Sequence, residues 1–194
     1  MMAGVENLRT HLENIQKYGM PVMVAINHFA SDSDDEVAAL TKWCKDNCYE
    51  VTFVDSFLKG SDGAIDYANK IMKLLEGESN YHKLYDYNLS IKEKIETISK
   101  EIYRAANVEF TDLANEQIAT YEKLGYGHTA VCMAKTPLSL SDNQKIQGAP
   151  KGHTIHVQSV NLSAGANFLV ALTGAVMTMP GLPKVPAAVK MENE

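Results

Sequence analysis

The chain has 194 residues with 18 basic and 24 acidic side chains, a formal net charge of −6 at pH 7. Its lysines and arginines are scattered, which argues against a nucleic-acid partner. The longest apolar runs fall short of the roughly 18 residues that a membrane span needs, and the N-terminus lacks a signal-peptide pattern, so we expect no membrane partner and a cytoplasmic location.

Three cysteines in a chain of this length are typical of a reducing compartment. Cys44 and Cys48 are one helical turn apart, so they could present two thiolates to a metal ion. Two further ligands with matching spacing are missing. We therefore interpret both cysteines as reduced thiols and expect no metal site.

The N-terminal part of the chain predicts the order helix, strand, helix. Apolar residues recur at helical spacing from Val5 to Ile15. Five consecutive apolar residues, 22–26, follow, and such a run is typical of a central parallel strand buried on both faces. Ser33 as N-cap and an acidic first turn then predict a second helix that ends near Asn47.

The same pattern recurs immediately afterwards. Residues 49–55 predict a second strand, residues 56–63 a loop rich in glycine and polar groups, and residues 64–75 a helix. In parallel sheets, ligands bind beyond the carboxyl ends of the strands. The loops that follow Ile26 and Val54 are therefore expected to meet over one crevice. The candidates for function at this crevice are Asn27, His28, Phe29 and Phe57.

The remaining sequence predicts a smaller α/β unit. Residues 77–88 are polar and rich in tyrosine, and they are typical of a connection. The expected elements are helices over 90–103, with Ser90 as N-cap and Glu93 in a capping box, and over 111–124, ended by Gly125, and short strands over 130–134, 154–160 and 168–172. We predict an α/β fold of two small units with mostly parallel sheets flanked by helices, divided into domains 1–104 and 105–194.

The sequence contains no phosphate-binding loop, dinucleotide fingerprint, zinc-protease motif or nucleophile elbow. Phe29 and Phe57 could clamp a flat heterocycle, with stacking worth roughly 1–3 kcal/mol per ring. Their spacing alone favours core packing instead. Asn27 could hydrogen-bond the edge of such a ring or cap the strand end, and the sequence leaves both readings open.

Three further side chains carry charge or titrate. His28 could titrate near neutral pH, but a lone histidine in a loop is more often a solvent-facing side chain. Lys135 and Lys184 could contact anionic groups, although the sequence favours solvated surface lysines at both positions. Spacing therefore defines candidate residues without defining a reaction.

Seven ordered segments of the chain resemble one protein family. They are Val24-Ala-Ile-Asn27-His-Phe29, Lys59-Gly60-x-x-Gly63, Leu89-Ser90-Ile-Lys92-x-Lys94-Ile95, Tyr121-Glu-x-Leu-Gly125-Tyr-Gly127, Val131-Cys-Met-Ala-Lys135-Thr136-x-x-Ser139-x-Ser141-Asp142, Leu162-Ser-Ala-Gly165-Ala and Met177-Thr-Met-Pro-Gly-Leu-Pro-Lys184-x-Pro186-Ala-Ala188. Through them the chain resembles the C-terminal third of formate–tetrahydrofolate ligase, a P-loop-type ligase. The resemblance covers nearly all 194 residues.

This resemblance implies an enzyme that uses ATP and formate to make formyl phosphate and then passes the formyl group to N10 of tetrahydrofolate. Tetrahydrofolate and ATP are then the expected substrates, with a monovalent cation as a further cofactor. By the same resemblance Phe29 and Phe57 flank the pterin site, Asn27 lies at its edge, and Lys59 and Gly60 belong to the substrate-binding set. Further candidates are Lys135, Thr136 and Lys184.

In that family the phosphate loop lies in an N-terminal domain. The resemblance therefore implies that catalysis needs that domain, or a full-length homologue, as partner, and that the isolated chain is inactive. It also implies a homo-oligomer. The alternative is a catalytically inactive, stand-alone module that binds a folate or purine or assists assembly.

The chain departs from the family pattern at three places. The position of Phe57 is usually tryptophan, so the clamp keeps a ring but offers less area and no indole N–H. The position of Ala30 is usually proline, which implies a less rigid loop here. Pro137 and Leu138 stand where the family usually has Gln-Tyr, which removes two hydrogen-bonding side chains.

Overall fold

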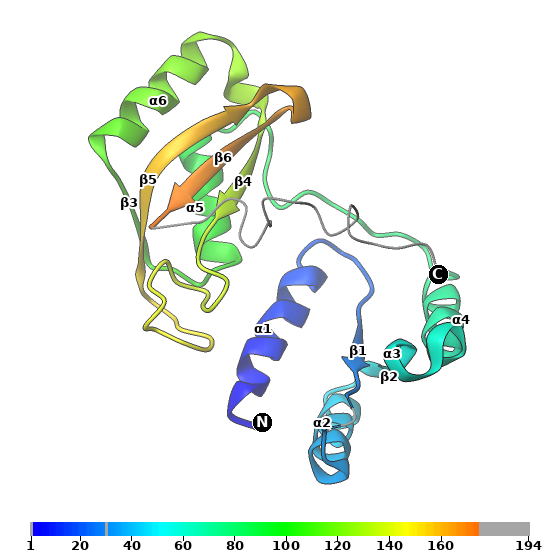
Figure 1. Ribbon diagram of the computed structural model, residues 1–194. Helices are drawn as coiled ribbons and strands as arrows, with labels where there is room; N and C mark the ends of the chain where they lie inside the picture. Colours follow the sequence, from blue (N-terminus) through cyan, green and yellow to red (C-terminus); the bar gives the residue numbers. More distant parts are fainter. Residues whose placement is uncertain (1, 30, 175–194) are drawn as a thin grey trace, which may run out of the picture.

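A computed structural model describes residues 2–29 and 31–174, which form two α/β units (Figure 1). Each unit has its own sheet with helices packed on it, and parallel pairing predominates. The predicted fold class is confirmed. Within this part of the chain, no helix has the length and apolar character needed to cross a membrane.

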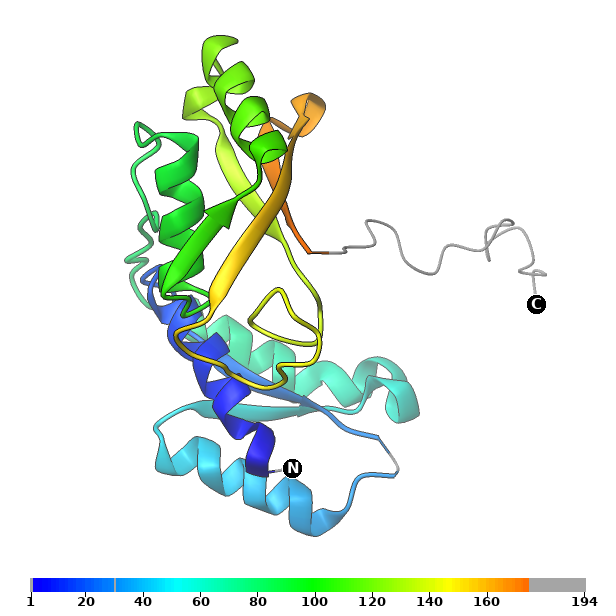
Figure 2. The same ribbon diagram turned by 90° about the vertical axis from the view of Figure 1, so that its left-hand side faces the viewer.

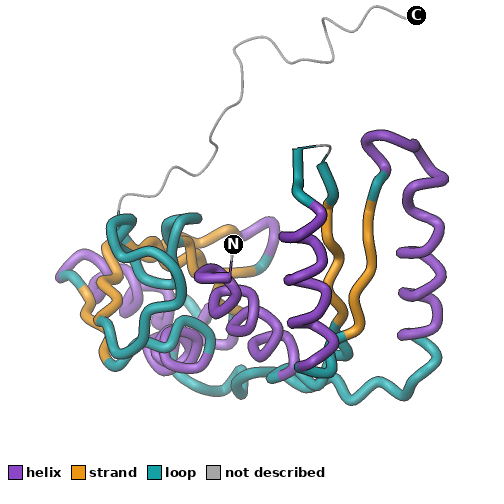
Figure 3. The backbone as a smooth tube through the Cα atoms, turned by 90° about the horizontal axis from the view of Figure 1, so that it is seen from below, coloured by secondary structure: helices purple, strands orange, loops and turns teal. Residues whose placement is uncertain are grey.

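The first unit runs from α1 to α4 and is built on a two-stranded parallel sheet. Its strands pair in register from Met23 opposite Glu50 to Asn27 opposite Val54. Figure 3 shows the two strands side by side between helices, with the loops that follow them at the same end. The elements are η1 (Met2–Gly4), α1 (Val5–Gln16), β1 (Met23–Asn27), α2 (Asp34–Asp46), β2 (Glu50–Val54), α3 (Ser56–Lys59), η2 (Gly60–Ala64) and α4 (Ile65–Leu74).

The expectation that the first strand is central and buried on both faces is wrong for the described chain. Val24 is buried, but Ala25 and Asn27 are exposed. The reason is that β1 has one strand neighbour, β2, in a sheet of two. The core of this unit is small: Leu12, Val24, Cys44 and Val51 are its buried members.

The second unit runs from α5 to β6 and is built on a four-stranded mixed sheet with strand order β3-β5-β6-β4. The outer pairs are parallel, and the central pair, β5 with β6, is antiparallel. The elements are α5 (Ile91–Glu101), β3 (Asn107–Phe110), α6 (Asp112–Lys123), η3 (Tyr126–His128), β4 (Ala130–Ala134), β5 (Thr154–Ser163), η4 (Ala164–Ala166) and β6 (Phe168–Thr173).

Helix α5 packs against the second sheet. Ile91 and Ile95 are fully buried in one cluster with residues of α6, β5 and β6. The predicted capping box is confirmed, because Ser90 Oγ accepts from the backbone N–H of Glu93 while the Glu93 carboxylate accepts from the backbone N–H of Ser90. The division into domains 1–104 and 105–194 remains a prediction, but the core contacts group α5 with the elements that follow it.

Helix α1 connects the two units (Figures 1 and 2). Its Asn14 side chain donates to the carbonyl oxygen of Ile102 at 2.9 Å, and Arg104 donates to the Thr10 hydroxyl at 2.6 Å. Lys17 forms an ion pair with Glu101 at 3.4 Å. These contacts hold the end of α5 against α1, so the first sheet has a fixed attachment to the second unit.

Candidate functional site

Backbone hydrogen bonds fix the starts of the loops after β1 and β2 at the carboxyl edge of the first sheet. His28 N–H donates to the carbonyl oxygen of Val54 at 3.1 Å, and Asp55 N–H donates to that of Gly63 at 3.0 Å. A shallow cavity of about 500 Å³ lies at this edge. The side chains and backbone that line it belong to His28, Asp34, Val37, Phe53, Asp55, Lys59, Asp62, Gly63 and Asp66.

The first loop presents the Phe29 ring to solvent. The Asp32 carboxylate accepts from the Phe29 N–H at 2.9 Å, and the Asp32 N–H donates to the Phe29 carbonyl at 3.0 Å. Ser33 then caps α2 by accepting from the Glu36 N–H at 3.3 Å. Phe29 remains 50% exposed, so it does not pack in the core.

The glycines of the second loop predicted an irregular segment. Instead this loop forms the single helical turn α3 and the 3-10 turn η2. The Asp55 carbonyl accepts from the N–H groups of Leu58 and Lys59, which closes α3. Gly60 then adopts φ +57°, a conformation that favours glycine. Phe57 sits on α3 and is 85% exposed. Neither predicted clamp residue is therefore a core residue.

Gly63 allows η2 to lie close to Asp55, the residue that follows β2. A Cβ at this position would lie 2.4 Å from the carbonyl oxygen of Asp55, which no side chain can occupy without moving the backbone. The absence of a side chain allows η2 to fold back onto the end of β2. This contact fixes where α3, and with it Phe57, leaves the sheet.

Asp55 is the charged centre of the edge. Its carboxylate is only 15% exposed and accepts from Lys59 Nζ at 2.6 Å, while His28 Nδ1 lies 3.7 Å from the other oxygen. The hydrogen bond from Lys59 is the main reason that the pKa of Asp55 lies below its usual value. Asp55 therefore carries a negative charge at neutral pH, and it contacts both loops.

The sequence-predicted residues divide into two groups. Asn27, His28, Phe29, Phe57, Lys59 and Gly60 lie at the carboxyl edge, where Asn27 is exposed at the end of β1. Lys135 and Thr136 follow β4 in the second unit, and among the described residues no hydrogen bond or ion pair connects them to that edge. Lys184 lies outside the described residues.

The side chains of Lys135 and Thr136 form hydrogen bonds within their own loop. Lys135 Nζ donates to the carbonyl oxygens of Thr136, at 2.9 Å, and of Ser139. Lys135 is half-buried, and burial lowers its pKa, so its ammonium group is directed at its own loop rather than freely solvated. Thr136 is buried, and its hydroxyl accepts from the Leu138 N–H at 3.2 Å.

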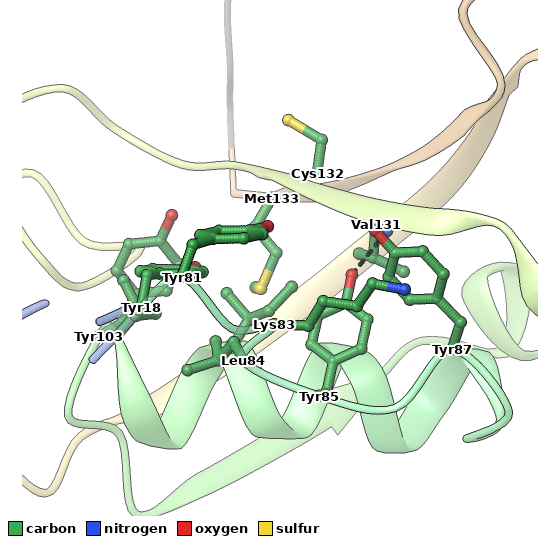
Figure 4. Close-up of a pocket in the computed structure, with 12 residues that line it drawn as sticks. Tyr18, Tyr81, Lys83, Leu84, Tyr85, Tyr87, Tyr103, Val131, Cys132 and Met133 are labelled. Carbon is green, nitrogen blue, oxygen red and sulfur yellow. Dashed lines mark hydrogen bonds between the residues drawn. The ribbon is translucent and has the colours of Figure 1, made fainter. Parts of the chain in front are cut away.

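A second concave region, which the sequence reading missed, is a tyrosine-lined cavity of about 280 Å³ between α5, β4 and the segment 81–87 (Figure 4). The Tyr85 hydroxyl accepts from the Val131 N–H at 3.0 Å, and Lys83 Nζ lies 3.9 Å from the centre of the Tyr87 ring. Burial raises the pKa of Tyr18, Tyr85 and Tyr103. Residues 77–88 were interpreted as a connection. Their many tyrosines were the sequence signal that could have indicated this region.

This tyrosine-lined cavity lies away from the carboxyl edge. Tyr18 precedes β1, and its carbonyl accepts from the His82 N–H at 3.0 Å, so the segment 81–87 passes the amino end of the strand. Figure 4 shows Cys132 pointing its sulfur away from the rings. The arrangement packs α1, the connection and α5 together, and we assign it a structural role.

Within residues 2–29 and 31–174, no three His, Cys, Asp or Glu side chains are arranged to hold a metal ion. Cys44 is buried and Cys48 is exposed, and both are free thiols. The chemistry that the carboxyl edge offers is therefore stacking by two exposed rings, hydrogen bonding by Asn27, and the charges of Asp55 and Lys59.

The family model described as formate–tetrahydrofolate ligase matches residues 1–194, the whole chain. The resemblance to this family that the seven sequence segments carry is thereby confirmed. The match assigns ligase chemistry in one-carbon and folate metabolism, with tetrahydrofolate and ATP as the substrates of the family.

Proposed function

We propose that this chain, which belongs to the formate–tetrahydrofolate ligase family, supplies the folate-binding side of the ATP-dependent formation of 10-formyltetrahydrofolate. Family membership gives the ligase function and the substrate class. The site is the carboxyl edge of the first sheet, where the pterin ring of tetrahydrofolate binds between Phe29 and Phe57. Asn27 hydrogen-bonds the edge of that ring.

The observation that carries this proposal is the exposure of two benzyl side chains on adjoining loops. Phe29 is 50% exposed and Phe57 is 85% exposed, although each follows a buried or half-buried strand segment. Stacking of a flat heterocycle on each ring is worth roughly 1–3 kcal/mol.

The residues of this chain bind and orient the folate. The sequence has no phosphate-loop motif, and catalysis of phosphoryl transfer depends on groups that neutralise the charge of the transferred phosphate. We therefore propose that a partner, the family's N-terminal domain or a full-length homologue, contributes the ATP site. The exposed carboxyl edge then receives formyl phosphate from that partner.

Calorimetric titration of the chain with tetrahydrofolate tests the proposal. Replacing Phe29→Ala or Phe57→Ala removes one stacking surface, so we expect each variant to bind at least fivefold more weakly than the unmodified chain. Leu124→Ala, which removes an exposed apolar side chain from the second unit, is the control and should bind normally. Unchanged affinity in both phenylalanine variants would overturn the clamp.

The lack of a phosphate-loop motif is also compatible with the alternative, a stand-alone folate-binding or assembly module. Both proposals expect the purified chain to make no 10-formyltetrahydrofolate from ATP and formate. They differ when a full-length homologue inactivated in its own folate site is added. Restored turnover supports a catalytic partner, and unchanged inactivity together with tetrahydrofolate binding supports the module.

A further inference from the structure

Helix α4 exposes an apolar stripe on the outside of the first unit, on the side remote from the second unit (Figures 1 and 3). Ile65, Met72 and Leu75 are 54%, 66% and 65% exposed, and Ala68 between them is exposed as well. Leu75 is the C-cap residue and continues the helix, because its N–H donates to the Ile71 carbonyl at 3.0 Å. Spacings of three, four and three residues place the four side chains of this α4 stripe on one face of the helix.

Two polar contacts fix which face of α4 lies on the sheet. The Thr52 hydroxyl of β2 donates to the Asp66 carboxylate at 2.7 Å, and Lys70 Nζ donates to the carbonyl oxygen of Val51 at 2.9 Å. The other large apolar side chains of the helix are half-buried, and they are Tyr67, Ile71 and Leu74. The α4 stripe therefore points away from β2, and α4 cannot rotate to cover it without breaking both contacts.

A row of apolar side chains at this spacing is what one helix presents to another. In a helix pair, apolar residues that alternate three and four positions apart insert between those of the facing helix. Single exposed apolar side chains are ordinary on a protein surface, but a continuous row of them marks an interaction site. The apolar arc of α4 is wider than the part that the sheet covers, so the helix has a face for a second neighbour.

The order of residues in the α4 stripe fits a second copy of the same helix. The spacings of three, four and three residues are the same when counted from either end. A two-fold axis that passes between two copies of one helix makes them antiparallel. If this axis crosses the middle of the stripe, Ile65 faces Leu75 of the second copy, and Ala68 faces Met72 of the second copy. The small Ala68 side chain then leaves room for the longer, flexible methionine.

We propose that the α4 stripe is a self-association surface, through which two copies of this chain form an isologous, antiparallel helix pair. The exposed parts of its four side chains amount to on the order of 400 Å² per copy, about half of what each partner buries in a standard interface. The dimer is therefore weak and concentration-dependent. This surface is separate from the residues that line the cavity at the carboxyl edge, so the inference does not depend on folate binding.

Sedimentation equilibrium of the full chain over a hundredfold range of concentration tests the dimer. We expect the average mass to rise from one chain mass toward two as the concentration increases. Met72→Glu places a charge in the contact and should weaken the dimer at least tenfold. Leu113→Glu is the matched control, because it adds the same charge at a side chain of α6 that is 53% exposed, and it should associate as the unmodified chain does.

Two results of this experiment would overturn the proposal. One is a single chain mass for the unmodified protein at every concentration. The other is equal weakening of the dimer by Met72→Glu and Leu113→Glu, which would make net charge, and not the α4 stripe, the cause. Both side chains are more than half exposed, so neither substitution changes the core, and circular dichroism verifies the fold of each variant.

A mixture of two variants tests the antiparallel register. Position 72 of one copy faces position 68 of the other, so an equimolar mixture of the Met72→Glu and Ala68→Lys chains pairs opposite charges across the contact. We expect this mixture to associate at least threefold more tightly than either variant associates with itself. Met72→Glu mixed with Ile65→Lys is the control and should gain less, because position 65 faces position 75. Equal gains in the two mixtures, or no gain in the first, would overturn the register.

Discussion

The two units of the molecule differ in how completely they bury their helices. In the second unit, α5 alone has five buried residues, and the central strands β5 and β6 alternate buried and less buried positions along their length. In the first unit, α1 has four buried residues, but α2 has one, Cys44, and α4 has none. The candidate site lies on the thinly packed unit.

The second unit has the larger packed core, whereas the first unit carries the candidate site. A well-packed core resists local opening, whereas a two-stranded sheet with few buried contacts is marginal by itself. The first unit depends on α1 and its bonds to Ile102 and Arg104 for attachment to the second. Side chains that remain uncovered on the thin unit, Phe29 and Phe57, are consequently available to a ligand.

The strongest test of this contrast is a pair of core truncations. Ile95→Ala removes a fully buried side chain from the second unit and should lower the free energy of unfolding by about 2–5 kcal/mol. Ile26→Ala removes a partly buried side chain at the first core and should cost less than about 2 kcal/mol. Urea unfolding followed by circular dichroism measures both, and equal costs would contradict the contrast.

A pair of glycine substitutions sharpens the comparison. Gly63→Ala forces a Cβ against the Asp55 carbonyl, so we expect a loss of about 1–3 kcal/mol in stability and weaker tetrahydrofolate binding as α3 moves. Gly165→Ala in the second unit meets no atom within 4 Å and serves as the control. Thermal unfolding and calorimetry report the two effects, and normal binding by Gly63→Ala would show that the loop contact does not position Phe57.

The smallest expected effect concerns pH. Burial lowers the pKa of His153 in the second unit below its ordinary value, so the unfolded chain binds its proton more readily than the folded chain does. Stability should therefore fall as the pH drops below the ordinary histidine pKa of about 6.5.

The variant His153→Phe should lose less stability between pH 7.5 and pH 5.5 than the unmodified chain. His11→Phe, at an exposed position of α1, is the control and should keep the full pH dependence. Urea unfolding at the two pH values gives the comparison. The same pH dependence in all three proteins would show that another group controls it.

Much of the local structure could be predicted from the sequence. The first two helix–strand repeats, the capping box at Ser90 and Glu93, and the strand Ala130–Ala134 follow from apolar periodicity and cap chemistry. These signals lie within short stretches of sequence, so they can be interpreted without knowledge of the fold. Strand β3 was missed although Val108 and Phe110 alternate with polar neighbours, because four residues give too short a pattern.

Features that depend on contacts between distant segments could not be predicted. The apolar run 22–26 indicated a strand but not how many neighbours it has, and therefore overstated its burial. The exposure of Phe29 and Phe57 reverses the reading that their spacing favoured. The approach of His28 and Lys59 to the Asp55 carboxylate joins two separate loops, so it depends on tertiary structure.

The pairing of Asn27 with Val54 has a consequence for how such a site can diverge. Backbone hydrogen bonds set the register of β1 and β2. The distance between the starts of the two loops therefore does not depend on the side chains that the loops carry. Exchanging one aromatic residue for another at position 57 would then change the ring on α3 without changing the register of the two strands. Substitutions in these loops can therefore change ligand selectivity while the strand pairing stays the same.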